Sequence, residues 1–291
     1  MLRYVAPNLV TSMAMVLGLL SVVSSFEGNY VESGWFILWA TFFDRVDGLV
    51  ARTLKATSAF GVQMDSFADF LNFGVAPACL MYCALSSTEA LPFTTGIGHT
   101  VIIATSVLWV LCATFRLARF NVLTDDSGDN SMFFGIPTTL AAGMLVNLFL
   151  VGLKYADPSN PLGDRAWFTE GHLFGAITLG PKVWTGIPIA MVIGALLMVS
   201  NLRMRKIGKL VNRKLNLGVS LLAITAMICG IGRVFPEYMV LLPSIWMAIW
   251  LPFGQLSPAF RHLESPPLFP VGSREPSGEN APAATPDSPA A

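Results

Sequence analysis

Four aspartates lie at regular spacing in two neighbouring apolar segments of the chain. Asp44 and Asp47 are three residues apart in the first segment, and Asp65 and Asp69 are four apart in the second. An unpaired carboxylate at membrane depth is costly, so four of them on adjacent segments imply that they share bound cations. Carboxylate oxygens without His or Cys favour Mg²⁺, Mn²⁺ or Ca²⁺ over zinc, and two cations bridged by carboxylates suit phosphoryl chemistry. The pattern therefore predicts a metal site that acts on a phosphate-bearing substrate.

The spacing also predicts how the acids are presented. On an α-helix, residues three or four apart share one face, so each segment offers a pair of carboxylates. A short polar connection that begins at Arg52 separates the two segments. We expect two antiparallel helices whose four acids converge just below the cytoplasmic surface of a membrane.

Small residues flank the acids. Gly48 and Ala51 follow Asp47, and Gly61 precedes Asp65. They either keep space open for a flat or extended group, or allow close packing of membrane helices. Arg52 is either a solvated interfacial charge or a bidentate partner for the oxygens of a metal-bound diphosphate, and we favour the phosphate role.

The composition is that of an integral membrane protein. Of 291 residues, 54% are hydrophobic and 12% charged, and the mean hydropathy is +0.62. The chain is predicted to form an all-α, polytopic integral membrane helix bundle with about eight transmembrane helices. The predicted spans are approximately 8–26, 33–54, 62–86, 99–120, 134–153, 183–202, 217–235 and 238–255.

The distribution of basic residues predicts the topology. With a cytoplasmic N-terminus, all but four of the eighteen Lys and Arg fall on cytoplasmic loops or helix ends, which supports both termini inside. We expect one membrane-embedded domain over residues 1–260. A Pro, Ser and Ala-rich cytoplasmic tail over residues 261–291 is expected to be disordered. The net charge of zero gives no indication of a nucleic-acid partner.

The string from Asp44 to Asp69 resembles the signature of the CDP-alcohol phosphotransferase family, D-x2-D-G-x2-A-R-x8-G-x3-D-x3-D, and matches every fixed position. The surrounding sequence is similar to the serine-accepting members of that family over about the first half of the chain. The strings that carry this likeness are Pro7-Asn8 with Thr11, Phe73-Gly74-Val75-Ala76-Pro77-Ala78, Arg116-Leu117-Ala118-Arg119-Phe120-Asn121 and Phe134-Gly135-Ile136-Pro137.

The resemblance implies a fold and a reaction. It implies a homodimer in a bacterial inner or cell membrane, with six core helices, two additional helices in this chain, and a cavity open to the cytoplasm. The phosphatidyl group of CDP-diacylglycerol would pass to the hydroxyl of L-serine, giving phosphatidylserine and CMP.

The resemblance also implies roles for the motif residues. The four aspartates would bind two divalent ions, Mg²⁺ or Mn²⁺, across the donor diphosphate. Asp44, Gly48, Ala51, Arg52 and Gly61 would form the site of the CDP-linked donor. Asp69 would also deprotonate the serine hydroxyl, which is chemically sensible because that hydroxyl is a weak nucleophile.

A serine acceptor needs at least one cation and some polar partners. Arg116 and Arg119 lie on one face of the fourth predicted span with Asn121 just beyond, although arginines there can equally snorkel to the headgroups. Ser66 and Asn72 follow the acids closely, and they either touch the acceptor, orient a carboxylate or bond between helices.

Two alternatives remain open at this stage. The motif does not separate serine from glycerol 3-phosphate, inositol phosphate or choline as acceptor. Intramembrane acids also occur in divalent-cation or proton-coupled transporters. A transporter predicts acids near the midplane and an inverted repeat, and the sequence has neither feature.

Overall fold

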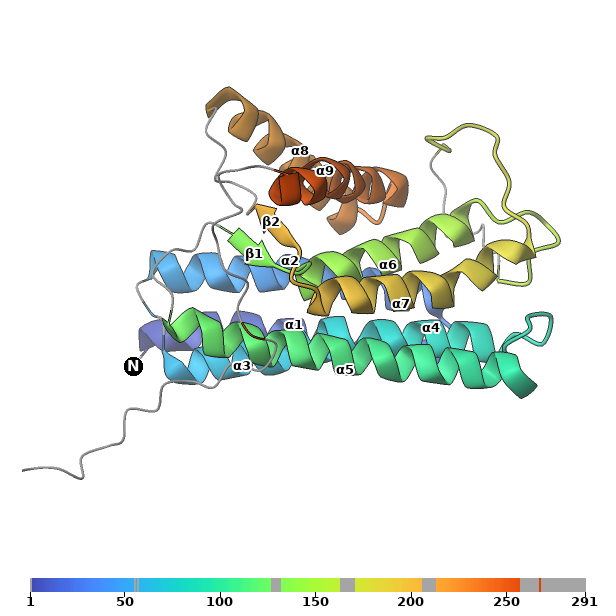
Figure 1. Cartoon of the computed structure of the whole chain (residues 1–291), viewed down its shortest axis with the longest axis horizontal. Helices are drawn as coiled ribbons and strands as arrows, with labels where there is room; N and C mark the ends of the chain where they lie inside the picture. The colour runs from blue at the N-terminus through green and yellow to red at the C-terminus, as the bar shows by residue number, and fades with distance from the viewer. Residues whose placement is uncertain are drawn as a thin grey trace, which may run out of the picture.

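The computed structural model describes residues 2–54, 56, 58–126, 132–162, 171–205, 213–256 and 267. Over this part of the chain the protein is a bundle of long helices (Figure 1). The predicted tail from residue 261 lies outside the described residues except for Pro267. The helices are α1 (Leu2–Phe26), α2 (Tyr30–Thr53), α3 (Ala59–Asp69), α4 (Ala76–Ser86), α5 (Gly96–Asp126), α6 (Thr138–Lys154), α7 (Gly186–Val199), α8 (Arg213–Ile231) and α9 (Pro236–Leu256).

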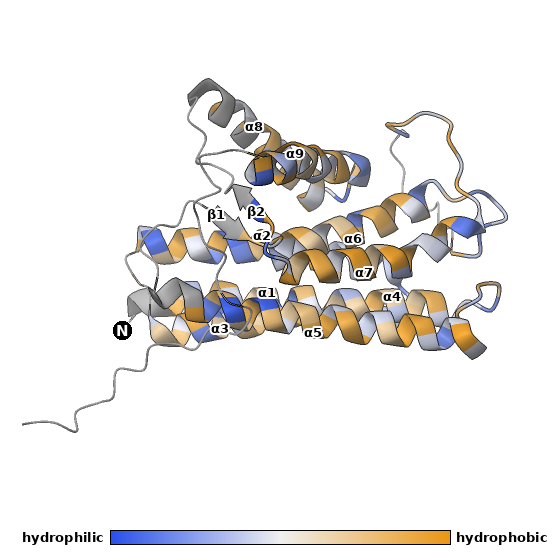
Figure 2. Ribbon diagram, in the orientation of Figure 1, coloured by the Kyte–Doolittle hydropathy of each residue, from blue (hydrophilic) through white to orange (hydrophobic). Residues whose placement is uncertain are grey.

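The predicted helical membrane bundle is confirmed in its main features. By length and composition, five helical stretches among the described residues could cross a membrane: Val5–Phe26, Ala59–Ser86, Gly96–Val122, Pro181–Val199 and Pro236–Leu256. Helix α6 is apolar but shorter. Hydrophobic residues cover much of the helix surfaces, with hydrophilic residues towards the helix ends (Figure 2). The predicted count of eight spans goes beyond these five.

Helix α1 organises the half of the bundle that carries the acids. It packs against α2, α3 and α4. Small hydroxyl residues allow the close approach of α1 and α2, because the Ser33 hydroxyl lies 2.9 Å from that of Ser21 and 2.8 Å from that of Ser25. Helices α8 and α9 lie outside the other helices, against α2 and α6 respectively (Figure 1).

The third predicted span is continuous but changes register. A π-helical segment, Phe70–Val75, joins α3 to α4 immediately after Asp69. Pro77 has no N–H, so the carbonyl of Phe73 lacks its usual helical donor four residues later. The buried indole of Trp109 on α5 supplies one instead, with Nε1 3.0 Å from that oxygen. This bond sets the register between α5 and the helix that carries Asp69.

A short β-sheet departs from the all-helical expectation. Strand β1 (Met132–Phe134) pairs antiparallel with β2 (Arg203–Arg205), so the stretches before α6 and after α7 lie side by side. Gly135 ends β1 with a φ of 74°, and a side chain there would meet the Met198 carbonyl. As a result, α6 begins at Thr138, four residues after the predicted start of its span.

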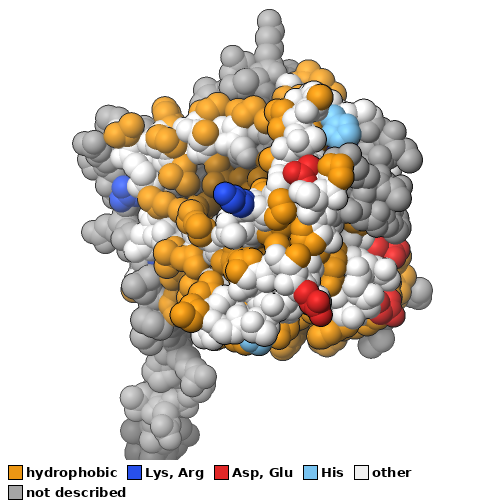
Figure 3. Space-filling view, turned by 90° about the vertical axis from the view of Figure 1, so that its right-hand side faces the viewer, with side chains coloured by type: hydrophobic (Ala, Val, Ile, Leu, Met, Phe, Trp, Pro, Cys, Tyr) orange, Lys and Arg blue, Asp and Glu red, His pale blue; other side chains and the backbone are white. Residues whose placement is uncertain are grey.

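The end of the bundle opposite the N-terminus is closed by loops. Figure 3 looks onto this end, where a Lys or Arg side chain lies in a hollow near the middle of a largely apolar face and the acidic side chains in view lie to one side. Inside the protein, Lys154 at the end of α6 and Glu237 at the start of α9 form an ion pair of 2.9 Å, and both side chains are fully buried. This pair anchors the start of α9 to the end of α6.

Candidate active site

Three of the four predicted aspartates meet at one point. Asp44 and Asp47 project from α2 and Asp65 from α3, and each offers a carboxylate oxygen within 4.8 Å of the others. This convergence of Asp44, Asp47 and Asp65 is the one the spacing predicts. Three carboxylates this close repel one another unless a cation or protons compensate them, so the group fits a divalent metal with oxygen ligands.

Asp69 completes the acidic cluster from the end of α3. It lies within electrostatic range of Asp44 and Asp65, and of the cationic Arg116 on α5. Its Oδ1 is buried and has no hydrogen-bond partner in the described part of the chain. A buried oxygen of this kind is expensive to leave unsatisfied, so the site is built to receive a cation or a hydrogen-bond donor there.

Thr11 on α1 supports the cluster from the side. Its hydroxyl lies 2.8 Å from Oδ2 of Asp47 and 3.1 Å from the carbonyl of Pro7. Because the hydroxyl has one proton and the carboxylate is both closer and charged, the proton is best placed on the bond to Asp47. Asp47 itself is only 5% exposed, so this bond orients a buried carboxylate.

The surroundings of the predicted donor site are open beside α2. A side chain at Gly48 would meet only the guanidinium of Arg52, at 3.8 Å, so Arg52 folds back along the helix towards the acids. Ala51 is half-buried one turn further on. These features are compatible with the predicted space for a substrate and with a cation at its edge.

Gly61 lies in a tighter setting. Its N–H donates to the Ser58 hydroxyl at 3.0 Å, which caps the N-terminus of α3. A side chain at Gly61 would lie 3.2 Å from that hydroxyl and 3.4 Å from the Asn8 side chain of α1. Close packing therefore explains the glycine here, and its role in donor binding stays a prediction.

The predicted acceptor residues divide into two groups. Arg116 lies near Asp69, and its Nη1 donates to the Thr138 hydroxyl at the start of α6 at 3.1 Å. Asn121 and Ser66 bond to each other at 2.8 Å and so join α5 to α3. Arg116 is therefore part of the acidic site, whereas Asn121 and Ser66 hold its walls together.

Two other predicted acceptor residues point to helix contacts. Arg119 donates to the Val199 carbonyl at the end of α7 at 3.4 Å and to the Asn201 side chain just beyond it at 2.5 Å. Asn72 is buried against Gly18 of α1. Their roles in acceptor binding stay predictions, and the contacts observed are those of structural residues.

Two positions gain importance from the structure. In the sequence, Thr11 is part of a string that carries the family resemblance, and Thr138 is the residue directly after Pro137. The signal for Thr11 was a hydroxyl four residues after a proline in an apolar helix. For Thr138 no sequence pattern links it to Arg116, because the contact spans 22 residues.

Comparison with known protein families gives a match to the part of the chain that contains this site. The family model described as CDP-alcohol phosphatidyltransferase matches residues 4–160, which include the whole acidic cluster and Arg116. This segment is just over half of the 291 residues.

Some individual relatives match more of the chain than the family model does. A CDP-diacylglycerol–serine O-phosphatidyltransferase of Helicobacter pylori strain J99 is 32% identical over 252 residues, covering 86% of this chain and 90% of the relative. The protein of that name from Mycobacterium tuberculosis H37Rv is 27% identical over 249 residues, covering 84% and 74%. An archaetidylserine synthase of Methanothermobacter thermautotrophicus is 36% identical over 148 residues, covering 50% and 58%.

Proposed function

The chain belongs to the CDP-alcohol phosphatidyltransferase family, and on that premise we propose that it transfers the phosphatidyl group of CDP-diacylglycerol to L-serine. The products are phosphatidylserine and CMP. The observation that carries the proposal is the meeting of Asp44, Asp47 and Asp65 within 4.8 Å, beside the buried and unpaired Asp69 oxygen. Both lie inside the segment that the family model matches.

The metal requirement follows from the oxygen-rich site. Asp44, Asp47, Asp65 and Asp69 would hold two divalent ions, Mg²⁺ or Mn²⁺, since hard oxygen ligands suit both. When bound, such ions neutralise the diphosphate charge and make CMP a better leaving group. The carboxylates would otherwise repel the anionic donor.

The remaining residues bind and orient the donor. Gly48 and Ala51 leave room beside α2 for the cytidine, and Arg52 pairs with phosphate oxygens. Thr11 keeps the Asp47 carboxylate in one orientation. The side chains of the site are therefore preorganised before the substrate binds, so they lose little orientational freedom during the reaction.

The chemical step needs a base and an electrophilic phosphorus. Asp69 accepts the proton of the serine hydroxyl, and the serine oxygen forms a bond to the phosphorus that bears diacylglycerol. The bond from that phosphorus to the CMP oxygen breaks, and its electron pair leaves with CMP. Arg116, held by Thr138, pairs with the carboxylate of serine and so places the hydroxyl near Asp69.

Serine is preferred over the other acceptors on two grounds. The bacterial relatives carry serine in their names, and the archaeal relative is named for a serine-containing lipid. Arg116 is one cation placed near Asp69, as a zwitterionic acceptor requires. A phosphorylated acceptor would need additional cations.

The membrane arrangement completes the proposal. We assign eight spans, six in the family core and two formed by α8 and α9, with both termini and the acidic site on the cytoplasmic side of a bacterial inner or cell membrane. The basic residues support this orientation. The family likeness supports a homodimer.

The test is an acceptor assay with purified protein. CDP-diacylglycerol and Mn²⁺ or Mg²⁺ are supplied with serine, glycerol 3-phosphate, inositol, inositol phosphate or choline in separate reactions, and CMP and lipid product are measured. EDTA provides the metal control. Metal-dependent CMP release matched by phosphatidylserine, with serine alone, supports the proposal. Release with a different acceptor overturns the serine assignment, and no release with any acceptor overturns the enzymatic one.

A further inference from the structure

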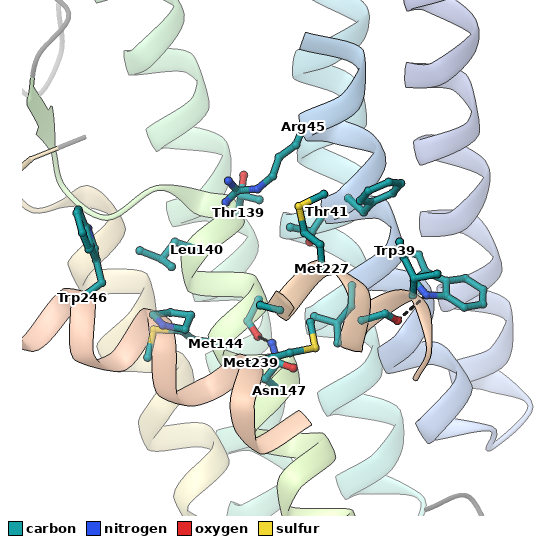
Figure 4. Close-up of a pocket in the computed structure, with 17 residues that line it drawn as sticks. Trp39, Thr41, Arg45, Thr139, Leu140, Met144, Asn147, Met227, Met239 and Trp246 are labelled. Atoms are coloured by element: carbon teal, nitrogen blue, oxygen red, sulfur yellow. Dashed lines mark hydrogen bonds between the residues drawn. The ribbon is translucent and has the colours of Figure 1, made fainter. Parts of the chain in front are cut away.

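A largely apolar cavity lies away from the acidic cluster, between α2, α6, α8 and α9 (Figure 4). It measures about 170 Å³. Its walls are mostly apolar and include Leu38, Leu140, Met144, Met227, Met239 and Trp246. Apolar cavities of about 150 Å³ in other proteins stay dry and take up benzene, so this one is large enough for a hydrocarbon segment.

The cavity and the acidic cluster use different faces of α2. Leu38 and Arg45 line the cavity, and they are seven residues apart on one stripe of the helix. Asp44 and Asp47 face the metal site. At about 100° per residue, the centre of the cavity stripe lies well over a quarter-turn from that of the acids. The cavity is therefore a separate site.

Most polar groups of the lining are satisfied within the protein. The Trp39 indole donates to the Gly230 carbonyl at 2.9 Å, and the Thr41 hydroxyl donates to the Ile37 carbonyl at 3.1 Å. The Asn147 amide donates to the Gly143 carbonyl at 2.7 Å. The surface offered to a ligand is therefore mainly hydrocarbon.

Arg45 is the charged exception. Its exposed side chain reaches along the cavity towards Thr139, and Asn147 lies at the other end (Figure 4). Thr139 and Asn147 are eight residues apart on α6, which corresponds to about 12 Å along the helix axis. The cavity thus has a cationic end and a long apolar body. An anionic amphiphile, with a negatively charged headgroup and a hydrocarbon chain, is complementary to both parts.

We propose that this cavity binds a membrane phospholipid other than the substrate, with one acyl chain along α6 and an anionic headgroup against Arg45. The occupant is a lipid and not a protein helix, because a helix with side chains is about 10–12 Å across and exceeds the space. Helix α9 is long and apolar enough to cross a membrane and α6 is apolar, so membrane lipids would have access to the cavity. Binding here does not depend on the proposed reaction.

Gly143 offers a direct way to fill the cavity. It lines the cavity, and a Cβ atom built there meets no atom within 4 Å, so Gly143→Leu can add bulk to the cavity wall without a clash at its Cβ. Gly218→Leu on α8 is the matched control, because Gly218 is equally open but does not line the cavity. Arg45→Gln removes the cationic end, and its charge also acts on the neighbouring Asp44.

The measurement is native mass spectrometry of the purified full chain in detergent, with dioleoylphosphatidylglycerol or dioleoylphosphatidylcholine added. We expect the unaltered protein and Gly218→Leu to retain one phosphatidylglycerol per protomer, and Gly143→Leu to lose it. Arg45→Gln should lose the preference for phosphatidylglycerol over phosphatidylcholine. Equal retention by Gly143→Leu and the unaltered protein would overturn the proposal, as would no retention by either. Unchanged Mn²⁺ binding by Gly143→Leu shows that the fold survives.

A further variant separates an acyl chain from a polar ligand. The Oδ1 atom of Asn147 is buried and has no hydrogen-bond partner among the described residues, and a hydrocarbon chain provides none. Asn147→Leu should therefore retain phosphatidylglycerol at least as well as the unaltered protein. If Asn147→Leu loses the lipid, the cavity recognises a hydrogen-bond donor instead, and the acyl-chain assignment is wrong.

Discussion

The hydroxyl of Thr11 lies 2.8 Å from Oδ2 of Asp47, so α1 orients a carboxylate that α2 contributes to the acidic cluster. Asp47 is almost fully buried, and water has little access to do this instead. Partners of this kind fix the direction in which a ligand oxygen points and commonly change metal affinity when they are removed. Thr11 is therefore a positioning residue for the proposed metal site.

Replacing Thr11 with valine tests this role, because valine keeps the shape and loses the hydroxyl. We expect Thr11→Val to weaken Mn²⁺ binding by about tenfold or more, and Thr11→Ser to restore most of it. Calorimetric titration with Mn²⁺ measures the effect without any turnover. Equal affinities in Thr11→Val and the unaltered protein would show that the hydroxyl serves packing only.

Asp69 carries the proposed proton transfer. Asp69→Asn keeps the shape of the side chain and one acceptor oxygen but cannot accept the serine proton, so CMP release should fall by about 10²- to 10⁴-fold. Donor binding should persist, because the other three aspartates remain. Glu89→Gln, the same change at an exposed loop position, should leave turnover unaltered. Near-normal turnover in Asp69→Asn would contradict the base assignment.

The acidic motif was predictable because it is local. Fixed spacing on two adjacent helices determines which face each carboxylate occupies, and Asp44, Asp47 and Asp65 meet as the spacing predicts. The approximate positions and order of the helices followed from apolar length in the same way. These features depend on residues close together in the chain.

The features that were missed depend on contacts between distant residues. Trp109 replaces the donor that Pro77 lacks, and this bond reaches across 36 residues. The pairing of β1 with β2 brings Phe134 opposite Arg203, which no local pattern signals. The same holds for Arg116 and Thr138. Hydrophobic periodicity in the sequence identifies helices and their apolar and polar faces. It does not identify which distant residues each face contacts.

Arg116 and Arg119 provide a matched pair for the acceptor site. Arg116 lies by Asp69, whereas Arg119 is bonded to Asn201 and a backbone carbonyl. Lysine cannot form the bidentate pair of hydrogen bonds that arginine makes with a carboxylate. We expect Arg116→Lys to raise the KM for serine about tenfold, or about 1.4 kcal/mol, with a smaller change in the KM for CDP-diacylglycerol.

The same substitution at Arg119 is the control. Arg119→Lys should lower thermal stability and leave the KM for serine nearly unchanged. Thr138→Val should raise the KM for serine less than Arg116→Lys does, because it removes only one bond to the guanidinium. A larger effect on the KM for serine from Arg119→Lys than from Arg116→Lys would mean that Arg119 binds the acceptor and that Arg116 is the structural residue. Steady-state kinetics with varied serine decides the point.

The ion pair of Lys154 and Glu237 should matter for stability and not for chemistry. Both side chains are fully buried, and the Tyr155 hydroxyl also bonds to Oε1 of Glu237 at 2.9 Å. Glu237→Gln keeps an acceptor for Tyr155 but takes the counter-charge from a buried ammonium. Breaking a buried pair in this way typically costs about 3 kcal/mol or more. We therefore expect a clear fall in the unfolding temperature in detergent.

A second ion pair in the same region gives the comparison. Arg233 and Glu32 lie 3.9 Å apart and are partly exposed, so Glu32→Gln should cost less than about 1 kcal/mol. The two substitutions make the same chemical change and differ in burial. Because the Lys154 pair anchors α9 over α6, Glu237→Gln should also reduce phosphatidylglycerol retention in the cavity of α2, α6, α8 and α9, whereas Glu32→Gln should not. Equal thermal shifts would mean that burial of the Lys154 pair contributes nothing, and α9 would then be held by its apolar contacts alone.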